Sequence, residues 1–387
     1  MKEFDVIIIG AGPAGSACAK KLAEAGLSVM IYDRRAEIGN PKRCGEGLSE
    51  NAENIIGKIP ERCIAQHIKG ARLYVPNGKN IDAKGEGYVL ERHVFDKWLA
   101  TEAVKAGAKI QCNTLISEII IENGFSKGVR GHFINKQFEA RAKLVVCATG
   151  AESPLPQQAG LKTACKLNLV DTCIQYEMAG IECDQDFIHI FLGNEIAPRG
   201  YVWIFPKGNG TANVGIGIVP GKRTPKEYLD EWIASRPEIA KGSIIEVNGG
   251  IVPVGGLLEN MVADGFIVCG EAAHHVNPIH GGGIKEAIVS GQAASKVIIE
   301  AIKKKDVSKK SLESFNKIWW EERGNHIKKV EKVREVMEKL TDNDYNDLID
   351  AVKAEDVVDF ARGAKLSVLA KALMRKPSLV MLARHLL

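Results

Sequence analysis

The stretch DVIIIGAGPAG, from Asp5 to Gly15, constrains the fold of this chain more strongly than any other. A short β-branched run leads into a GxGxxG turn that begins at Gly10, and an amphipathic helical segment follows as far as Gly26. The segment LSVMIYD then predicts a second strand that ends on Asp33. Together these parts predict a complete βαβ unit of the kind that binds a dinucleotide.

The residue types in this unit suit a pyrophosphate. Gly10, Gly12 and Gly15 let the backbone approach the phosphates at the N-terminus of the helix, where the N–H groups and the helix dipole favour an anion. Asp33 stands where the hydroxyl groups of a ribose are held. The alternative is a doubly wound domain that binds no phosphate, and the complete set of parts favours the dinucleotide.

The rest of the chain alternates between two kinds of pattern, and its 387 residues suggest two or three domains. The predicted fold class is α/β: a Rossmann-like dinucleotide-binding domain is interleaved with an antiparallel-sheet substrate domain, and a C-terminal helical region follows. We assign residues 1–60, 90–170 and 253–302 to the first domain, 61–89 and 171–252 to the second, and 303–387 to the helical region.

Composition excludes several classes of function. A net charge of +4 does not suit a nucleic-acid-binding protein. The nine cysteines include no CxxC pair and no metal-ligand spacing, so we expect reduced thiols in a cytoplasmic protein and no metal. No apolar run approaches the ~18 residues that span a bilayer. Peripheral contact with the inner face of the cell membrane stays open.

An unusual aromatic stretch reads PRGYVWIFPKGNGTANVGIG, from Pro198 to Gly217. Tyr201, Trp203 and Phe205 occupy alternate positions, so a strand would place all three rings on one face. That face either packs on an ordinary core or forms a wall towards a ligand. The residue pattern alone leaves both interpretations open.

Five stretches of the chain together resemble the geranylgeranyl reductase family of flavoproteins, within the group that shares the p-hydroxybenzoate hydroxylase fold. Four of them are GAGPAG with its second-strand acid, GNPKRCGEG, LERHVFD and CGEAAHHVNPIHGGGI. The fifth is the aromatic stretch, since members of the family carry YxWxFP, then seven or eight residues, then GxG. The resemblance covers approximately residues 1–300.

The resemblance implies that the dinucleotide is FAD and that the substrate is a prenyl chain. The FAD contacts it implies are Gly10, Gly12, Ala14, Gly15, Asp33, Cys44, Gly45, Gly47, Arg92, Ile116, Glu271, Gly283 and Ile284. The substrate wall it implies comprises Tyr201, Trp203, Phe205, Gly215 and Gly217. Aromatic rings suit a polyprenyl chain because they offer large rigid apolar area and contact with alkene π-electrons, and glycines allow close approach of a ligand.

The chain departs from the family pattern at three positions. Relatives usually carry Asp at the position of Glu271 and Glu at that of Asp33, so the two carboxylates are exchanged in length. Relatives often carry Asp where this chain has Thr149, in a region that helps aromatic hydroxylases bind NADPH. This departure weakens the case for direct docking of NADPH in this region, and the electron donor stays open between NADPH, ferredoxin and others.

Cys44 is the candidate catalytic residue. In the family a cysteine here lies beside the flavin ring, and Lys42 and Arg43 precede it, which would lower the pKa of its thiol. We expect it to supply a proton or to hold substrate and flavin in register. The alternative is a buried, inert cysteine. His274, His275 and His280 share one loop and are expected to be structural or hydrogen-bonding residues.

The expected function is FAD-dependent reduction of isoprenoid double bonds in geranylgeranyl ether-lipid precursors or geranylgeranyl diphosphate. One alternative is a flavin-dependent aromatic monooxygenase, and another is a flavin electron carrier or lipid-binding protein without turnover. The tail from Phe360 to Leu387 has six basic residues and no acidic one, and Pro377 is expected to divide it into two helical pieces. The tail either caps the substrate domain or rests on anionic lipid.

Overall fold

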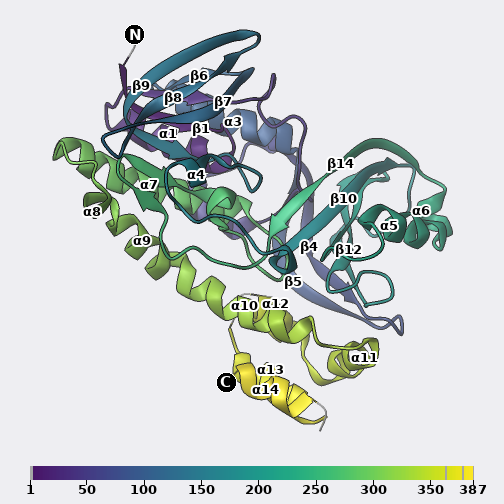
Figure 1. The fold of residues 1–387 in the computed structure, drawn as a ribbon. Helices are drawn as coiled ribbons and strands as arrows, with labels where there is room; N and C mark the ends of the chain where they lie inside the picture. Colours follow the sequence, from purple (N-terminus) through teal and green to yellow (C-terminus); the bar gives the residue numbers. More distant parts are fainter. Residues whose placement is uncertain (1–2, 362–363, 377–378, 387) are drawn as a thin grey trace.

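The computed structural model describes residues 3–361, 364–376 and 379–386. Two sheets stand side by side, and helices from the last part of the chain lie beneath them (Figure 1). Segments far apart in the sequence alternate between the two sheets, as the interleaved pattern predicted.

The first sheet is built around the predicted βαβ unit. Strands β1, β2, β6, β9 and β16 pair in parallel, β15 pairs antiparallel at one edge, and β7 and β8 extend β9 as an antiparallel meander. Their bounds, in spatial order, are β15 Val262–Ala263, β16 Phe266–Val268, β9 Lys136–Cys147, β1 Glu3–Ile9, β2 Val29–Tyr32 and β6 Lys109–Gln111, with β7 Thr114–Glu122 and β8 Phe125–Phe133. Runs of Val and Ile form the central strands because both faces of a parallel sheet are buried.

Three long helices cover this sheet: α1 (Pro13–Glu24), α3 (Arg92–Lys105) and α7 (Ile284–Lys303). Helix α1 packs against both of the others. At its start the chain passes so close to β1 that a Cβ atom on Gly15 would stand 1.9 Å from the carbonyl oxygen of Gly10. A Cβ atom on Gly12 would meet no heavy atom within 4 Å. The two glycines therefore serve different purposes, since Gly15 allows packing and Gly12 faces open space.

The second sheet has the order β14-β10-β13-β12-β11-β4-β5-β3. Its neighbouring strands are antiparallel except for the parallel pair β11–β4. The bounds are β14 Ser243–Pro253, β10 Val170–Ala179, β13 Thr211–Ile218, β12 Tyr201–Gly208, β11 Phe187–Leu192, β4 Ile64–Tyr74, β5 Asn80–Leu90 and β3 Gly47–Ser49. Strand β3 directly follows the Cys44 loop, so this loop is attached to the second sheet although we assigned residues 1–60 to the first domain.

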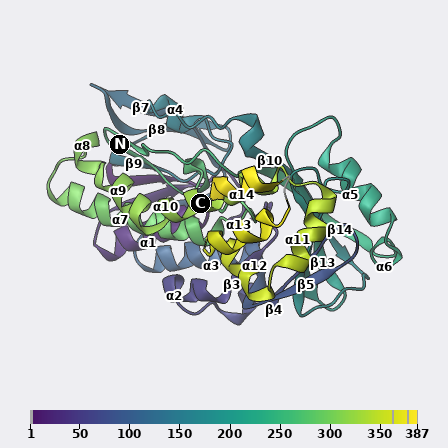
Figure 2. The same ribbon diagram turned by 90° about the horizontal axis from the view of Figure 1, so that it is seen from below.

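Helices of the C-terminal region run from the first sheet to the second and cover the junction (Figure 2). They are α8 Lys309–Leu312, α9 Ser314–Trp319, α10 Asn325–Met337, α11 Asp342–Ala351, α12 Ala354–Ala361, α13 Leu366–Met374 and α14 Val380–Leu386. Helices α2 Glu53–Ile56, α4 Leu155–Gln158, α5 Pro225–Ala234 and α6 Pro237–Ala240 lie elsewhere. Leu369, Leu373, Leu379 and Leu386 are buried in a core that they share with α10 and with Val75, the residue after β4.

The predicted α/β fold class with a helical C-terminal region is confirmed. Most leucines of the tail cap the structure. Pro377 lies outside the described residues, as does Leu387. Within the described ranges, no helix has the length and apolar character needed to cross a membrane.

The contrast between Gly15 and Gly12 yields a stability test. We expect Gly15→Ala to lower the free energy of unfolding by about 1–3 kcal/mol, because the added methyl group overlaps backbone. Gly12→Ala should change it by less than about 0.5 kcal/mol. Urea unfolding of the protein stripped of cofactor measures both. Equal destabilisation by the two variants would contradict the packing role of Gly15.

Candidate active site between the two sheets

A cavity of about 970 Å³ separates the carboxyl ends of the first sheet from the face of the second. Its volume is at the upper end of the ~300–1,000 Å³ that is usual for small-molecule sites. The glycine turn, the end of β2 and the loop after β9 line one side, as does the N-terminus of α7. Strands β10, β11 and β12 line the other side, together with α12. The carboxyl ends of parallel strands are where open α/β sheets bind ligands.

This cavity brings together nearly all of the site residues predicted from the sequence. Those that line it are Gly10, Gly12, Ala14, Asp33, Cys44, Gly45, Gly47, Arg92, Ile116, Tyr201, Trp203, Phe205, Gly217, Glu271, Gly283 and Ile284. Gly15 and Gly215 lie behind the lining, where each allows close packing of protein atoms. The residues come from both sheets, so the cavity exists only where the two meet.

The Asp33 carboxylate braces the glycine turn. One oxygen accepts a hydrogen bond from the N–H of Ala11 (2.8 Å), and the other accepts one from the N–H of Arg35 (2.9 Å). The side chain is buried at the end of β2, within the cavity lining. Asp33 therefore orients the turn as well as presenting a carboxylate where a ribose was expected.

The three aromatic side chains of β12 line the cavity on one face. The ring centroids of Tyr201 and Trp203 lie 5.7 Å apart, and those of Trp203 and Phe205 lie 6.3 Å apart. The Tyr201 hydroxyl donates to the carbonyl oxygen of His280 (2.7 Å), and the Trp203 indole donates to Gln175 Oε1 (2.8 Å). The rings are thus fixed in place and form a wall of the cavity.

Of the two glycines opposite these rings, Gly217 lines the cavity and Gly215 does not. Gly215 is paired with Trp203 across the strands, and a Cβ atom there would stand 2.4 Å from the indole ring. Gly217 is paired with Tyr201, and a Cβ atom added there would stand 3.0 Å from Cys173 Sγ. The missing side chain at Gly215 thus makes room for Trp203, and the indole ring, not the glycine backbone, lines the cavity at that position.

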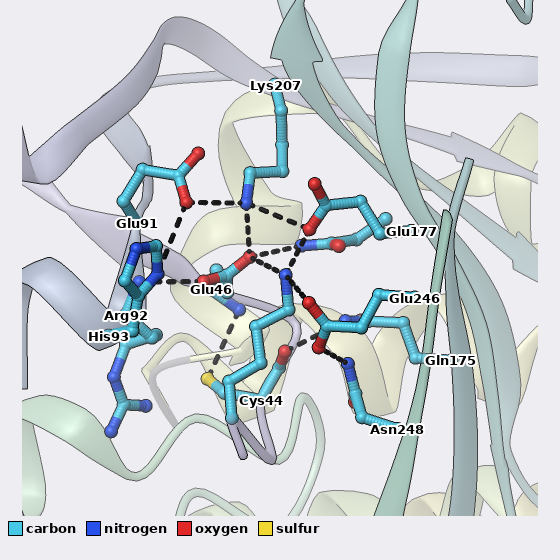
Figure 3. A network of polar contacts seen from close by, with 12 residues as sticks. Cys44, Glu46, Glu91, Arg92, His93, Gln175, Glu177, Lys207, Glu246 and Asn248 are labelled. Atoms are coloured by element: carbon cyan, nitrogen blue, oxygen red, sulfur yellow. Dashed lines mark hydrogen bonds and ion pairs between the residues drawn. The ribbon is translucent and has the colours of Figure 1, made fainter. Parts of the chain in front are cut away.

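Cys44 lines the cavity, on the loop that leads into β3, and lies next to a network of polar contacts (Figure 3). Its Sγ atom accepts a hydrogen bond from the N–H of Glu46 (3.1 Å), and its carbonyl oxygen accepts one from Gln175 Nε2 (3.0 Å). The ring of Phe205 covers the flanking glycines so closely that a Cβ atom on Gly45 or Gly47 would stand 2.9 Å from it. Residues of the second sheet therefore fix the position of the Cys44 loop.

The expected effect of the neighbouring cations on this thiol is wrong. Lys42 is directed to Glu177 and Glu246, and Arg43 pairs with Glu152, so neither charge faces the sulfur. Burial raises the pKa of the Cys44 thiol above its usual value, and the Arg92 guanidinium opposes that rise only in part. At neutral pH Cys44 is a protonated thiol, suited to donating a proton.

Arg92 and Glu271 are the other ionisable groups from the predicted set. The Arg92 guanidinium forms a bidentate pair with Asp96, with N–O distances of 3.0 and 2.9 Å. Burial raises the pKa of the Glu271 carboxyl to about 7, against the influence of the Arg92 charge. Glu271 lines the cavity beside the turn at Gly150.

The side chains of His274 and His275 form polar and ring contacts with other groups of the protein. The two ring nitrogens of His274 lie 2.8 and 3.1 Å from the carbonyl oxygens of Gly256 and Thr163. The His275 ring stacks on Trp319 with a centroid distance of 3.6 Å, and its Nδ1 lies 2.8 Å from Ser290 Oγ. These contacts assign His274 and His275 to the support of the loop.

Sequence reasoning missed several buried polar residues around the Cys44 loop. Glu46, Lys207, Gln175 and Asn213 are all buried, and all contact the loop or belong to it. A signal was present at Lys207, because a lysine that directly follows an apolar strand segment is uncommon unless it is paired. The position of its partners in the fold could not be read from the sequence.

Comparison with known proteins agrees with this geometry. Residues 170–252 match the family model of the geranylgeranyl reductase catalytic domain, and residues 4–180 match that of pyridine nucleotide-disulphide oxidoreductases. The chain is 40% identical to digeranylgeranylglycerophospholipid reductase 2 of Methanopyrus kandleri, with 100% of both chains covered. It is 42% identical to the digeranylgeranylglycerophospholipid reductase of Methanosarcina acetivorans over 91% of this chain and 89% of the relative.

Solved structures show the same architecture. A geranylgeranyl bacteriochlorophyll reductase-like protein from Thermoplasma acidophilum superposes with a TM-score of 0.92 and 36% identity, with 100% of both chains covered. The chondrochloren halogenase, an FAD-dependent enzyme that is 19% identical, shares the fold with a TM-score of 0.69 over 85% of this chain and 82% of the halogenase. The match to the reductases extends through the C-terminal helices, beyond the first 300 residues where the resemblance was noted. The chain belongs to the geranylgeranyl reductase family of flavoproteins.

Proposed function

We propose that this protein uses FAD to saturate the double bonds of geranylgeranyl chains carried by an ether-lipid precursor. The observation that carries the proposal is the single cavity in which a dinucleotide-type glycine turn, a protonated cysteine thiol and an aromatic wall face one another. The digeranylgeranyl lipid named for the relatives sets the substrate class. The aromatic-monooxygenase alternative would leave unexplained the similarity over nearly the whole chain to relatives named for lipid reduction.

The residues at the glycine turn fit FAD. Open space beside Gly12 allows a pyrophosphate to reach the N-terminus of α1, which starts with Pro13 and carries no side-chain cap. The Asp33 carboxylate and Ile116 lie along the same side of the cavity, as do Gly283 and Ile284 at the start of α7. Reduced FAD bound here would supply hydride to an alkene carbon.

The protein supplies the proton and the position of the chain. An isolated alkene is a poor hydride acceptor, so a proton at the second carbon must carry part of the barrier. The Cys44 thiol keeps its proton at neutral pH and faces the cavity, so Sγ is the proposed donor. Reprotonation of the thiolate and renewed reduction of the flavin follow, and each saturated bond consumes two electrons from an external donor.

An apolar extension of the cavity suits the rest of the prenyl chain. It runs over β4, β5 and β11 and is covered by α12. The apolar residues lining it are Ile68, Ala71, Leu73, Ala83, Ile188, Ile190, Leu192, Val357 and Val358. Burial of a polyprenyl chain against them contributes roughly 0.8 kcal/mol per methylene.

We further propose that α13 and α14 rest on anionic lipid. Most of their leucines are buried, but Val368, Met374 and Met381 remain 37, 38 and 74% exposed. Lys371, Arg375 and Arg384 on the same helices are also exposed. Apolar burial and attraction of about 1 kcal/mol per basic residue near an anionic surface would act together. Because α13 packs on α12, which lines the cavity, a lipid could enter from that side.

Cys44 is tested by substitution. We expect Cys44→Ser to keep FAD and to lose at least about tenfold in alkene reduction, because a serine hydroxyl is a far weaker acid. Cys63→Ser and Cys112→Ser, outside the cavity lining, should stay within about twofold of the wild type. Product mass of digeranylgeranylglyceryl phosphate after steady-state turnover provides the measurement. Wild-type rates in Cys44→Ser would show that the thiol is not the proton donor.

Trp203 and Trp232 make a matched pair for the aromatic wall. Both are buried, but Trp203 lines the cavity and Trp232 packs in the core behind the same sheet. Each Trp→Ala change should cost about 3–5 kcal/mol of stability. Only Trp203→Ala should also weaken prenyl-lipid binding, measured by titration calorimetry with FAD bound. If both variants bind lipid equally, the ring serves core packing alone.

Membrane contact is tested by introducing negative charges on the exposed face. The double variant Met374→Glu/Met381→Glu should bind vesicles of anionic phosphatidylglycerol several-fold more weakly, and wild-type binding should fall with salt. The matched control is Ile245→Glu/Val247→Glu on β14, which changes equally exposed apolar residues elsewhere. Deletion of the tail is a poor test, since it removes buried leucines. Unchanged vesicle binding in the α13–α14 variant would refute the contact.

A further inference from the structure

Glu46, two residues after Cys44, is buried and strained. Its side chain is completely buried, and its backbone has φ = 75°, in the left-handed region that favours glycine. Charged side chains are almost never fully buried unless they are paired, and a strained non-glycine residue persists only where its surroundings hold it. Both features point to a specific task for this carboxylate.

Glu46 forms hydrogen bonds with four other elements of the fold, and Figure 3 shows those with Lys207 and Arg92. Oε2 accepts hydrogen bonds from Lys207 Nζ on β12 (3.0 Å) and from Asn213 Nδ2 on β13 (2.7 Å). Oε1 accepts one from the N–H of Arg92, the first residue of α3 (2.7 Å). Its carbonyl oxygen accepts one from the N–H of Leu90 at the end of β5 (2.9 Å). One residue thereby joins the loop to three strands and a helix.

The two lysines beside Glu46 have further carboxylate partners. Lys207 Nζ lies 3.0 Å from Glu91 and 3.1 Å from Glu177, and Lys42 Nζ lies 3.4 Å from Glu46 itself. Lys42 also pairs with Glu177 and Glu246. Burial alone would lower the pKa of each lysine, but the carboxylates raise both above the usual value, so both stay charged. The two lysine charges are therefore available to these carboxylates across the neutral pH range.

Both groups that act on the Cys44 thiol depend on this carboxylate. The N–H that donates to Cys44 Sγ belongs to Glu46. The guanidinium that favours the thiolate belongs to Arg92, whose backbone N–H is held by Glu46 Oε1. The N-terminus of α3 carries no cap from its own Glu91 side chain, and Glu46 replaces that cap from a distance. Displacement of Glu46 would move the thiol and its two neighbours together.

We propose that Glu46 is a positioning residue, which fixes the Cys44 thiol against the cavity wall by anchoring its loop to Lys207, Asn213 and the start of α3. The proposal rests on the proposed role of Cys44 in the reduction. The competing explanation is a structural ion network that holds the two sheets together without controlling the thiol. The two differ in what happens at Cys44 when the fold is kept.

Substitutions at Glu46 and Lys207 separate these explanations. Glu46→Gly tolerates the left-handed backbone and removes only the side chain, while Glu46→Gln keeps the shape and removes the charge. Lys207→Met breaks the same contact from β12. The matched control is Arg72→Met, which breaks a bidentate pair with Asp82 on β4 and β5, away from the loop.

The measurement is the rate of Cys44 alkylation by iodoacetamide, read by peptide mass spectrometry at pH 8 with Cys112 as the internal reference. Wild-type Cys44 should react slowly, since its thiol pKa is raised. We expect at least a tenfold faster reaction in Glu46→Gly and Lys207→Met, and a smaller increase in Glu46→Gln, with Cys112 unchanged. In the reductase assay, kcat should fall at least tenfold in the same variants while KM changes less than threefold. Arg72→Met should match the wild type in both assays.

The outcomes decide the proposal independently of the catalytic role. If Cys44 alkylation stays at the wild-type rate in Glu46→Gly, or in Lys207→Met where Glu46→Gly does not fold, the positioning role is overturned. If Arg72→Met accelerates alkylation equally, the network is only structural. If Cys44→Ser retains full reductase activity while Glu46→Gly still exposes Cys44, the proposed function of Cys44 fails and the anchoring by Glu46 stands.

Discussion

Opposite charges tie the Cys44 loop and the start of α3 to the second sheet. Lys207, on the second sheet, meets Glu46 of the Cys44 loop and Glu91 at the start of α3 within 3.0 Å each. Removing one partner would leave a charge uncompensated in the interior, which typically costs about 3–5 kcal/mol. Apolar contacts could hold the sheets together, but they are not directional and would not fix one relative position. Directional ion pairs set one relative position, and this position places the glycine turn opposite the aromatic wall.

Local patterns predicted the parts of the molecule that local physics determines. The βαβ unit was readable because a glycine turn, a helix and a terminal acid must follow one another at short range. The aromatic face of β12 was readable from its period of two. The antiparallel character of the second sheet was predicted as well, apart from its parallel pair β11–β4, whose partners lie more than a hundred residues apart.

Interactions between segments far apart in the chain could not be predicted from the sequence. Lys42 and Arg43 adjoin Cys44 in the chain, yet their carboxylate partners draw them away, so burial and not charge dominates the pKa of the thiol. Gly215 was expected to face the ligand, whereas the cross-strand register gives its space to Trp203. The sequence of the tail is compatible both with a cap on the substrate domain and with a surface that rests on lipid. The structure shows that Leu369, Leu373, Leu379 and Leu386 are buried. Each of these outcomes depends on tertiary neighbours.

The central claim is that one cavity couples a reduced flavin to a prenyl alkene, and a single anaerobic turnover tests it most directly. Protein with bound FAD is reduced with dithionite, freed of excess reductant and mixed with digeranylgeranylglyceryl phosphate, while flavin absorbance and lipid mass are followed together. The account predicts that the flavin reoxidises without oxygen and that each reoxidised flavin adds two hydrogens to the lipid. A flavin that stays reduced beside bound, unchanged lipid would contradict the account and leave a binding protein without turnover.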